Sequence, residues 1–308
     1  MNEDISLEEV LMVKVSWYYY IEGMTQQKIS ELLDISRIRV IKLLEKARQT
    51  GIIQFKIRED RAGRMETERK LITSYGLKDA FVVPTAQSAE NVNANIAKAA
   101  AIYLFSKIDA NSAINIGYGD TASKILNNLA AMTEYPITCI SLTGGVSHYL
   151  PNTQSQVFNV KLNLMPIPLL VSSKELAAMM RNEPSVMEIS RMIKLSDMSV
   201  VGIGAMTDTA TVIKSSILST NDFLYLKLGG AVGDILSHFI DKDGRLVETD
   251  IEDRLISTPL ETIKNLKNVV GVAAGPSKVT AIKAALTGGY LDILITDELT
   301  AGALTAEE

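Results

Sequence analysis

Cysteine and histidine are scarce in this sequence of 308 residues, which contains one cysteine and two histidines. A single cysteine, Cys139, excludes a disulfide within the chain and fits a reducing compartment. His148 and His238 are far apart, and no spacing of histidine, cysteine and carboxylate residues suggests a metal site. No apolar run reaches the roughly 18 residues of a membrane span. We therefore expect a cytoplasmic protein that has no membrane partner and needs no metal or other cofactor.

The residues that are present are those of an ordinary globular protein, with 47% hydrophobic and 22% charged residues. A chain of this length predicts two domains. The net charge is −5, yet residues 35–58 carry seven basic residues against one acid, Glu45. A basic segment in an acidic chain indicates a local anionic partner, and the DNA backbone is the obvious one.

Residues 25–51 show the pattern of two short helices joined by a tight turn. Thr25 and Ser36 are suitable N-caps, and Gly51 can end the second helix because glycine tolerates positive φ. We expect the inner face of the first helix to consist of Ile29, Leu32 and Leu33. Two helices in this arrangement are the sequence form of a helix-turn-helix.

The second helix carries different chemistry on its two faces. Helical spacing places a buried stripe at Val40, Leu43, Leu44 and Ala47. Basic residues gather on the opposite face, so we predict DNA contacts from Thr25, Gln26, Ser36, Arg37, Ile38, Arg39, Lys42 and Lys46. The alternative is a solvated amphipathic helix whose charges only maintain solubility.

Further elements should complete this N-terminal domain. Ser6 opens a capping box for a helix that runs to about residue 22, and Trp17 and residues 18–20 are expected to close the small core. Residues 52–58 alternate like a strand and are expected to form a wing or a closing strand. The charge-dense segment that follows places the domain boundary between a helix-turn-helix domain, 1–58, and an effector domain, 59–308.

The second domain alternates apolar strands with helices, which predicts an α/β fold with a doubly wound, mostly parallel sheet. The predicted strands are 80–83, 113–117, 137–142, 167–172, 198–203, 269–273 and 291–296. The predicted helices are 64–75, 91–106, 121–132, 173–195 and 277–286. Ligands of such sheets bind beyond the carboxyl ends of the strands.

Glycine-rich loops follow several of these strands and form the candidate pocket. The loops are IGYGDT (116–121), LTGGVSH (142–148), GAVGDI (230–235) and AAGPSK (273–278). Lys278 falls in a first helical turn, where the macrodipole disfavours a cation, so an anionic ligand explains it better than helix stability does. Asp234 lies between apolar residues and needs partners such as sugar hydroxyls or backbone N–H groups. Residues 198–204 lack the third glycine of a dinucleotide fingerprint and indicate a buried strand and a tight turn.

These four loops form part of a pattern that extends to two longer segments, YYYIEGMTQQKISELLDISRIRVIKLLEKARQTGII and the ending LTGGYLDILITDELTAGAL. Together they resemble the SorC family of bacterial transcriptional regulators. The resemblance extends over nearly the whole chain. It implies a tetrameric regulator, expected to be a repressor, whose effector is a phosphorylated sugar or polyol. It also implies an effector domain related in fold to sugar-phosphate isomerases and deaminases.

The resemblance also assigns effector-binding residues. It implies phosphate contacts from Asp120, Thr121, Gly144, Gly145 and Lys278, a sugar contact from Asp234, and further contributions from Gly119, Thr143 and His148. Asp120 departs from the family pattern, since some relatives have a hydroxyl there, and it either caps the helix or holds a sugar hydroxyl. Thr143 replaces a lysine or an arginine, so covalent capture of an aldehyde is not expected.

Two functions stay open at this point. The first is an effector-controlled DNA-binding regulator without catalytic residues. The second is a sugar-phosphate isomerase or deaminase joined to a DNA-binding domain. Such an enzyme needs a positioned acid and base, and Asp234, Asp297 and His148 are candidates that no motif ties together.

Overall fold

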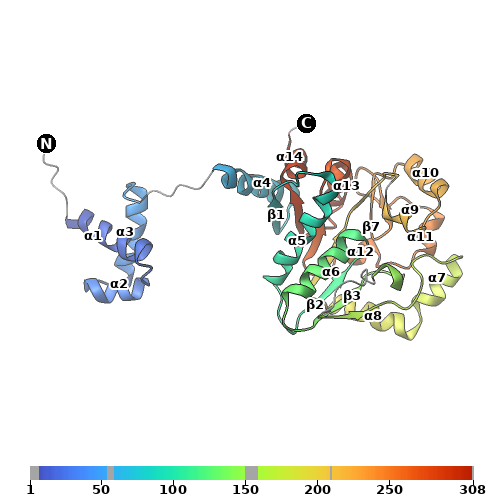
Figure 1. Cartoon of the computed structure of the whole chain (residues 1–308), viewed down its shortest axis with the longest axis horizontal. Coiled ribbons are helices and arrows are strands. Elements are labelled where there is room, and N and C mark those ends of the chain that lie inside the picture. Colours follow the sequence, from blue (N-terminus) through green and yellow to red (C-terminus); the bar gives the residue numbers. More distant parts are fainter. Residues whose placement is uncertain (1–6, 54–58, 150–158, 209, 307–308) are drawn as a thin grey trace. The chain divides into compact units, whose positions relative to one another are not determined.

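The computed structural model describes residues 7–53, 59–149, 159–208 and 210–306, apart from the side chains of residues 59–62 and of His148. The chain divides into two compact units, 1–62 and 63–308 (Figure 1).

The N-terminal unit is a small helical bundle. It consists of α1 (Leu7–Ser16), a π-helical turn (Trp17–Ile21), α2 (Gln26–Leu33) and α3 (Arg37–Gln49). Its core is formed by Met12, Val15, Ile29, Val40, Leu43, Leu44 and Ala47, all at most 5% exposed. The predicted inner face of α3 is therefore confirmed.

Some details of this unit differ from the sequence-based expectation. Leu32 is 56% exposed, because it lies on the flank of α2 that turns away from Ile29 and Leu33. Trp17 is 55% exposed and donates through Nε1 to Glu22, whereas residues 18–20 do pack on the core. Most of the predicted wing, residues 54–58, and the predicted cap Ser6 lie outside the described residues.

The larger unit is built on a seven-stranded sheet in the order β1-β10-β9-β5-β2-β3-β4, in which all neighbours pair in parallel. The strands are β1 (Asp79–Val83), β2 (Ala113–Ile116), β3 (Ile137–Ser141), β4 (Val160–Asn163), β5 (Met198–Gly202), β9 (Val269–Val272) and β10 (Ile293–Asp297). A second, antiparallel sheet contains β6 (Gly204–Ala205), β7 (Gly233–Ile235) and β8 (His238–Ile240).

Helices connect the strands, and several of them cover the two faces of the large sheet. They are α4 (Glu59–Tyr75), α5 (Val92–Phe105), α6 (Asp120–Met132), α7 (Lys174–Arg181), α8 (Pro184–Leu195), α9 (Thr211–Lys214), α10 (Thr220–Leu228), α11 (Asp250–Arg254), α12 (Leu260–Ile263), α13 (Val279–Thr287) and α14 (Glu298–Thr305). Short 3₁₀ turns lie at Ala89–Asn91, Val146–His148 and Pro276–Lys278.

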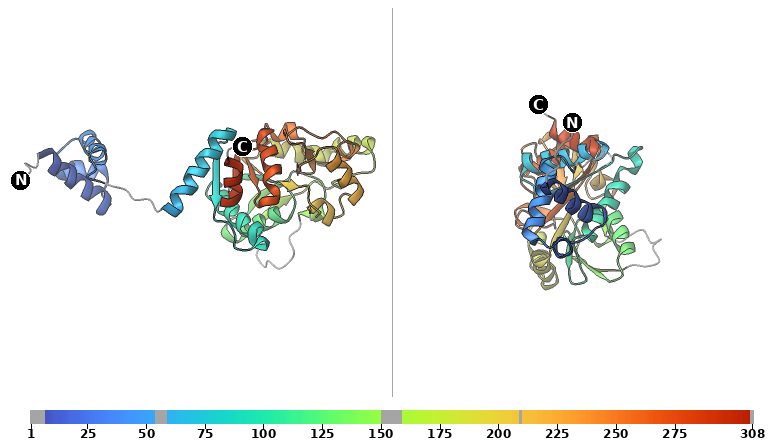
Figure 2. Two further views of the ribbon diagram at one scale, coloured as in Figure 1. Left: turned by 90° about the horizontal axis from the view of Figure 1, so that it is seen from above. Right: turned by 90° about the vertical axis from the view of Figure 1, so that its left-hand side faces the viewer.

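Alternate side chains of the strands supply two separate cores. On one face, Ile114, Ile116 and Val200 pack with α5 and α6, which lie side by side. On the other face, Val201 and Leu294 pack with α4, α8, α13 and α14. Figure 2 shows from a second direction that α13 and α14 are neighbours on this face. The predicted doubly wound α/β class is confirmed.

Two predicted elements of this unit are wrong in detail. Residues 167–172 form no strand, because Pro166 and Pro168 lack the N–H groups that a ladder requires; only Leu170 makes a bridge, to Leu255. The edge strand beside β3 is instead β4. The predicted helix 173–195 is two helices, and Pro184 is the first residue of the second.

The strand order reverses between β2 and β5. The chain proceeds from β2 towards β3 and β4 on one side, and from β5 towards β9 and β10 on the other. In open parallel sheets, the connections at such a reversal lead away from each other and leave a crevice at the strand ends. The ends of β2 and β5 are therefore where a ligand site is expected.

Candidate functional site

The turn of the helix-turn-helix is fixed by caps at both helix starts. The Thr25 side chain accepts from the Lys28 N–H at 3.3 Å, and Ser36 accepts from the Arg39 N–H at 3.2 Å. Between them, Asp34 adopts the left-handed conformation (φ +52°) that ends α2. Each cap satisfies an N–H that the helix itself leaves unpaired.

The exposed face of α3 carries the predicted DNA contacts. Arg37, Ile38, Arg39, Lys42 and Lys46 are all exposed, as is the cap Ser36. Thr25, Gln26 and Arg37 line one shallow hollow at the starts of α2 and α3. The structure thus assembles the predicted residues on one unit, and their contact with DNA stays a prediction.

Lys46 differs from the other basic residues of this face. Its Nζ lies 2.6 Å from Glu8 Oε2, and both side chains are about half exposed. This contact lowers the pKa of Glu8. An exposed ion pair is weak and is screened by salt, so Lys46 stays available to a DNA phosphate.

A pocket lies at the ends of β2 and β5, where the strand order reverses. It holds about 90 Å³ and is lined by Asn93, Tyr118, Gly119, Asp120, Thr121, Gly202, Ile203, Gly204, Thr211, Val212, Asp234, Leu236 and Lys278. Segments that are far apart in the sequence therefore meet at one site, as the strand order requires.

One wall of the pocket is the start of α6. Gly119 is the N-cap residue and has φ +111°, a conformation that side chains rarely permit. The first N–H groups of α6 have no partner within the helix and carry the positive end of its dipole. Thr121 lies in this turn and is 8% exposed. This wall suits an anionic group of a ligand.

Asp234 supplies a buried carboxylate and is only 9% exposed. Its Oδ2 accepts from the Ser237 N–H at 3.0 Å. Its side chain occupies the space beside Gly204, where a Cβ atom would overlap the carboxylate. Burial raises the pKa of Asp234, while the Ser237 N–H, Lys278 and His238 act in the opposite direction.

Lys278 enters the pocket from the loop after β9. It is the N-cap residue of α13 and follows Gly275, whose φ is +112°. Burial lowers the pKa of Lys278, against the attraction of Asp234 and Asp120. Within the described part of the chain, its ammonium group has no hydrogen bond or ion pair.

Asp120 at the rim is already paired. Lys124 Nζ lies 2.6 and 2.5 Å from its two carboxylate oxygens, and Asn93 Nδ2 donates to it at 3.2 Å. Asp120 is the first residue of α6 and does not cap it, because the cap position belongs to Gly119. The rim is therefore close to neutral, and the uncompensated groups lie deeper, at Asp234 and Lys278.

The pocket brings together five of the predicted effector-binding residues, Gly119, Asp120, Thr121, Asp234 and Lys278. The loop after β3 lies elsewhere. Thr143 is fully buried, with its hydroxyl 2.8 Å from that of Tyr149.

The two glycines of that loop are engaged with other segments. The amides of Gly144 and Gly145 donate to Ile256 and Ile167 at 2.9 and 2.7 Å, and Gly145 lines a separate hollow. The effector roles assigned to Thr143, Gly144 and Gly145 stay predictions without support from this pocket. The side chain of His148 lies outside the described residues.

Several pocket residues were not predicted. Tyr118 stands within the glycine-rich loop after β2. Gly202 ends β5 and Gly204 begins β6, in the segment interpreted only as a strand and a turn. These three residues lie at strand ends, where a parallel sheet binds its ligands, so their positions in the sequence could have indicated the pocket. Asn93 and Thr211 are reached only by the folding of α5 and α9, and no sequence pattern marks them.

Comparisons with known proteins agree with this architecture. A family model described as "Putative sugar-binding domain" matches residues 60–306. The transcriptional regulator LsrR of Klebsiella pneumoniae is 35% identical over 303 residues, which cover 97% of this chain and 94% of that protein. LsrR of Escherichia coli is 34% identical over 308 residues, covering 99% of this chain and 97% of that protein.

Solved structures share the fold. The full-length sorbitol operon regulator SorC from Klebsiella pneumoniae superimposes with a TM-score of 0.71 and 24% identity, covering 99% of this chain and 100% of that chain. A DeoR family transcriptional regulator from Listeria monocytogenes gives a TM-score of 0.70 and 27% identity, covering 79% of this chain and 99% of that chain.

A helix-turn-helix unit and a sugar-binding α/β domain define a sugar-responsive transcriptional regulator, with DNA and a sugar effector as its partners. The chain belongs to the SorC family, as the motifs predicted. Its relatives are regulators, which decides between the regulator and the enzyme that the sequence left open. Among the described residues, no helix is long and apolar enough to cross a membrane and no cluster of metal-ligating side chains occurs.

Replacing Arg39 by alanine should relax sequence specificity. A bidentate arginine–guanine contact contributes about 1–3 kcal/mol of discrimination, so Arg39→Ala should lose more affinity for a fragment selected from a random DNA library than for random DNA. Lys46→Ala should weaken both equally and reduce the salt dependence. Arg48→Ala, which removes one charge from another side of α3, is the matched control in a fluorescence-anisotropy titration. Equal losses on both DNAs for Arg39→Ala would contradict the assignment.

Asp234→Asn should stabilise the ligand-free protein at neutral and higher pH. Because burial raises the pKa of Asp234 in the folded state, the ionised carboxylate reduces stability above that pKa. This penalty vanishes as the pH falls below the ordinary aspartate pKa of about 3.9. Thermal melts should therefore show a higher Tm for the variant at pH 8 and a gap that closes towards pH 4. Asp120→Asn, at the paired rim carboxylate, should leave the Tm unchanged. A higher Tm for the wild type than for Asp234→Asn at pH 8 would refute the argument.

Proposed function

We propose that this chain represses a carbohydrate or polyol operon and that a phosphorylated sugar or polyol, bound in the pocket at the ends of β2 and β5, releases or remodels its complex with operator DNA. The ammonium group of Lys278, which has no partner among the described residues, is the observation that carries this proposal. A cation without a partner in a partly enclosed site is costly unless a ligand supplies the counter-charge. A phosphate monoester supplies about −1.5 to −2 charge near neutral pH.

The phosphate fits best between Lys278 and the start of α6. The free N–H groups of that helix supply several donors, and Lys278 supplies a full charge. Asp120 is the obvious source of repulsion, but its carboxylate is held by Lys124 and Asn93. The geometry therefore supports an anion at this wall in spite of the nearby acid.

The sugar then extends towards Asp234. Within the described structure, Oδ2 of Asp234 accepts from Ser237, and Oδ1 has no donor. A sugar or polyol hydroxyl can donate to this oxygen. The solved relative from Klebsiella pneumoniae regulates a sorbitol operon, which is consistent with a polyol in such a site.

Two-fold or higher assembly belongs to the same proposal. A single helix-turn-helix has too little surface for tight specific binding, and a symmetric oligomer supplies a second half-site. We propose a homotetramer in which the effector changes the spacing of the DNA-binding units.

Lys278→Ala should abolish the response to a phosphorylated effector and leave operator affinity nearly unchanged. Losing a charged hydrogen bond of about 1.5–3 kcal/mol lowers effector affinity roughly ten- to hundredfold. A thermal-shift screen with ribose 5-phosphate, fructose 6-phosphate, sorbitol 6-phosphate and their unphosphorylated forms measures this, followed by operator release. Lys161→Ala, on the edge strand β4, is the matched control. A variant that responds at the wild-type effector concentration would place the phosphate elsewhere.

The oligomeric state should be that of a tetramer at micromolar concentration. Light scattering coupled to size exclusion, with and without operator DNA, measures the mass directly. A monomer that still binds one operator tightly would rule out the proposed assembly.

A further inference from the structure

The hairpin that carries Asp234 is closed by an unusual turn. Strands β7 and β8 are joined by two residues, Leu236 and Ser237, and Ile235 pairs with His238 across the turn. Both joining residues have positive φ, +56° and +67°. A two-residue hairpin with this backbone is a type I′ turn, which favours asparagine and glycine. Leucine and serine are strained in this conformation, so contacts with other parts of the structure must hold the turn in place.

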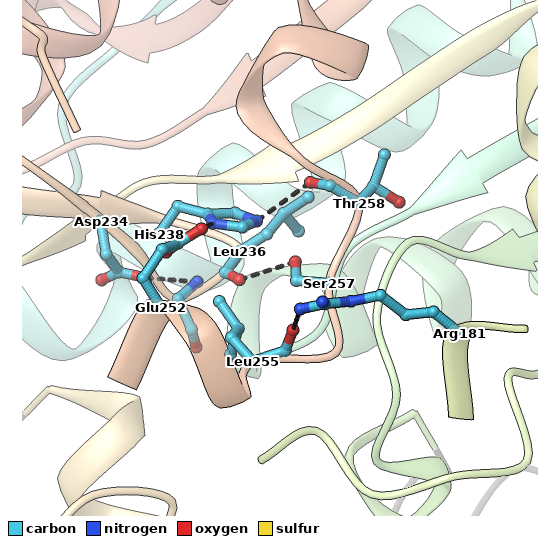
Figure 3. A network of polar contacts seen from close by, with 9 residues as sticks. Arg181, Asp234, Leu236, His238, Glu252, Leu255, Ser257 and Thr258 are labelled. Carbon is cyan, nitrogen blue, oxygen red and sulfur yellow. Dashed lines mark hydrogen bonds and ion pairs between the residues drawn. The ribbon is translucent and has the colours of Figure 1, made fainter. Parts of the chain in front are cut away.

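Side chains from other segments hold the two strained residues in place. The Ser237 hydroxyl lies 2.5 Å from the Tyr118 hydroxyl, and the Ser257 hydroxyl donates to the Leu236 carbonyl at 2.9 Å. Tyr118 follows β2 and Ser257 follows α11, so two segments that are distant in the sequence hold the turn. Figure 3 shows the Ser257 contact beside Asp234 and His238.

The residue after the turn is fixed as well. His238 is 2% exposed, and its Nδ1 lies 2.8 Å from Glu252 Oε1 while its Nε2 lies 3.0 Å from the Thr258 carbonyl (Figure 3). Both neighbours of the ring are acceptors, so in either tautomer the protonated ring nitrogen can donate to one of them. The base of the hairpin is thereby anchored to α11 and to the segment that follows it.

The strained conformation has two consequences for the pocket. It directs the Ser237 N–H to Asp234 Oδ2, which leaves Oδ1 for a ligand. It also places the Leu236 side chain in the pocket wall, against Gly117, where a Cβ atom would lie 2.8 Å from Leu236 Cδ2. An Asn-Gly turn would be less strained but would lack both the apolar wall and the hydroxyl that meets Tyr118.

We propose that Ser237 is a positioning residue for effector recognition: held by Tyr118 in a strained turn, it fixes the Asp234 carboxylate in the orientation that accepts a hydroxyl of the sugar or polyol. This inference rests on the proposed function of the pocket. Ser237 does not line the pocket itself, so it acts through Asp234 and not by touching the ligand. The phosphate end, at Lys278 and α6, should not depend on it.

A double-mutant cycle tests this role. The ligand is whichever of ribose 5-phosphate, fructose 6-phosphate and sorbitol 6-phosphate binds the wild type best. Ser237→Ala should lower the affinity for this ligand about three- to tenfold, the range expected for one hydrogen bond. Affinity for inorganic phosphate should stay within about twofold. In an Asp234→Asn background, Ser237→Ala should have no further effect, because the group that it positions is absent. Isothermal titration calorimetry on the full chain measures all of these affinities.

Two further variants separate positioning from damage to the fold. Tyr118→Phe removes the partner of the Ser237 hydroxyl, and it should add little to Ser237→Ala. Ser216→Ala is the matched control, because Ser216 also has positive φ (+53°) but does not line this pocket. It should leave both affinities unchanged, and circular dichroism should show that every variant is folded.

The possible results distinguish this inference from the proposed function. If the wild type binds none of the three sugar phosphates, the proposed function fails and the inference fails with it. If the wild type binds one of them but the effects of Ser237→Ala and Asp234→Asn add independently, or if inorganic phosphate is weakened equally, Ser237 has only a structural role. The pocket assignment would then survive without the positioning residue.

Discussion

Asp234 and Lys278 bring opposite charges into one partly enclosed pocket without forming an ion pair with each other. Burying charges costs free energy unless partners compensate, and here burial shifts the pKa of each group towards its neutral form. An arrangement of this kind adds nothing to folding by itself. It becomes favourable when a ligand offers an anion at one end and a hydroxyl at the other, which is the chemistry of a phosphorylated sugar or polyol.

The rest of the pocket can be understood as the framework that allows this placement. The reversal of strand order between β2 and β5 opens the crevice, and glycines at the two strand ends leave room for side chains from the hairpin. Gly204 makes space for the Asp234 carboxylate, and Gly117 makes space for Leu236. The glycines and the hairpin residues are thus complementary parts of one packing arrangement, although Asp234 lies 30 positions after Gly204, the nearer glycine.

Sequence reasoning predicted the fold class and the six buried parallel strands well, because such strands are long apolar runs bounded by glycine-rich loops. It missed β4, whose residues Val160–Asn163 are only partly buried at the sheet edge, and the antiparallel sheet, whose strands have two or three residues. A strand of two or three residues is too short to show a periodicity. It also placed a strand at 167–172, where apolar residues are common but prolines remove the necessary donors.

In the candidate site, too, the sequence predicted some residues and missed others. Asp234 and Lys278 were found because their residue types conflict with their surroundings, an acid among apolar residues and a cation at a helix start. The Leu236–Ser237 turn carries no Asn-Gly signal, and its conformation depends on Tyr118 and Ser257, which are distant in sequence. A conformation imposed by tertiary contacts against local preference cannot be read from the local sequence.

The same contacts agree with the proposal that this pocket binds a ligand and does not transform it. General acid–base catalysis needs side chains that are free to exchange a proton with the substrate. Asp297 is 2% exposed and caps α14 by accepting from the Thr300 N–H at 2.9 Å. Of the two candidate acids whose side chains are described, Asp234 lines the pocket and Asp297 does not. One oxygen of Asp234 already accepts from the Ser237 N–H, and the other can orient a hydroxyl of the ligand.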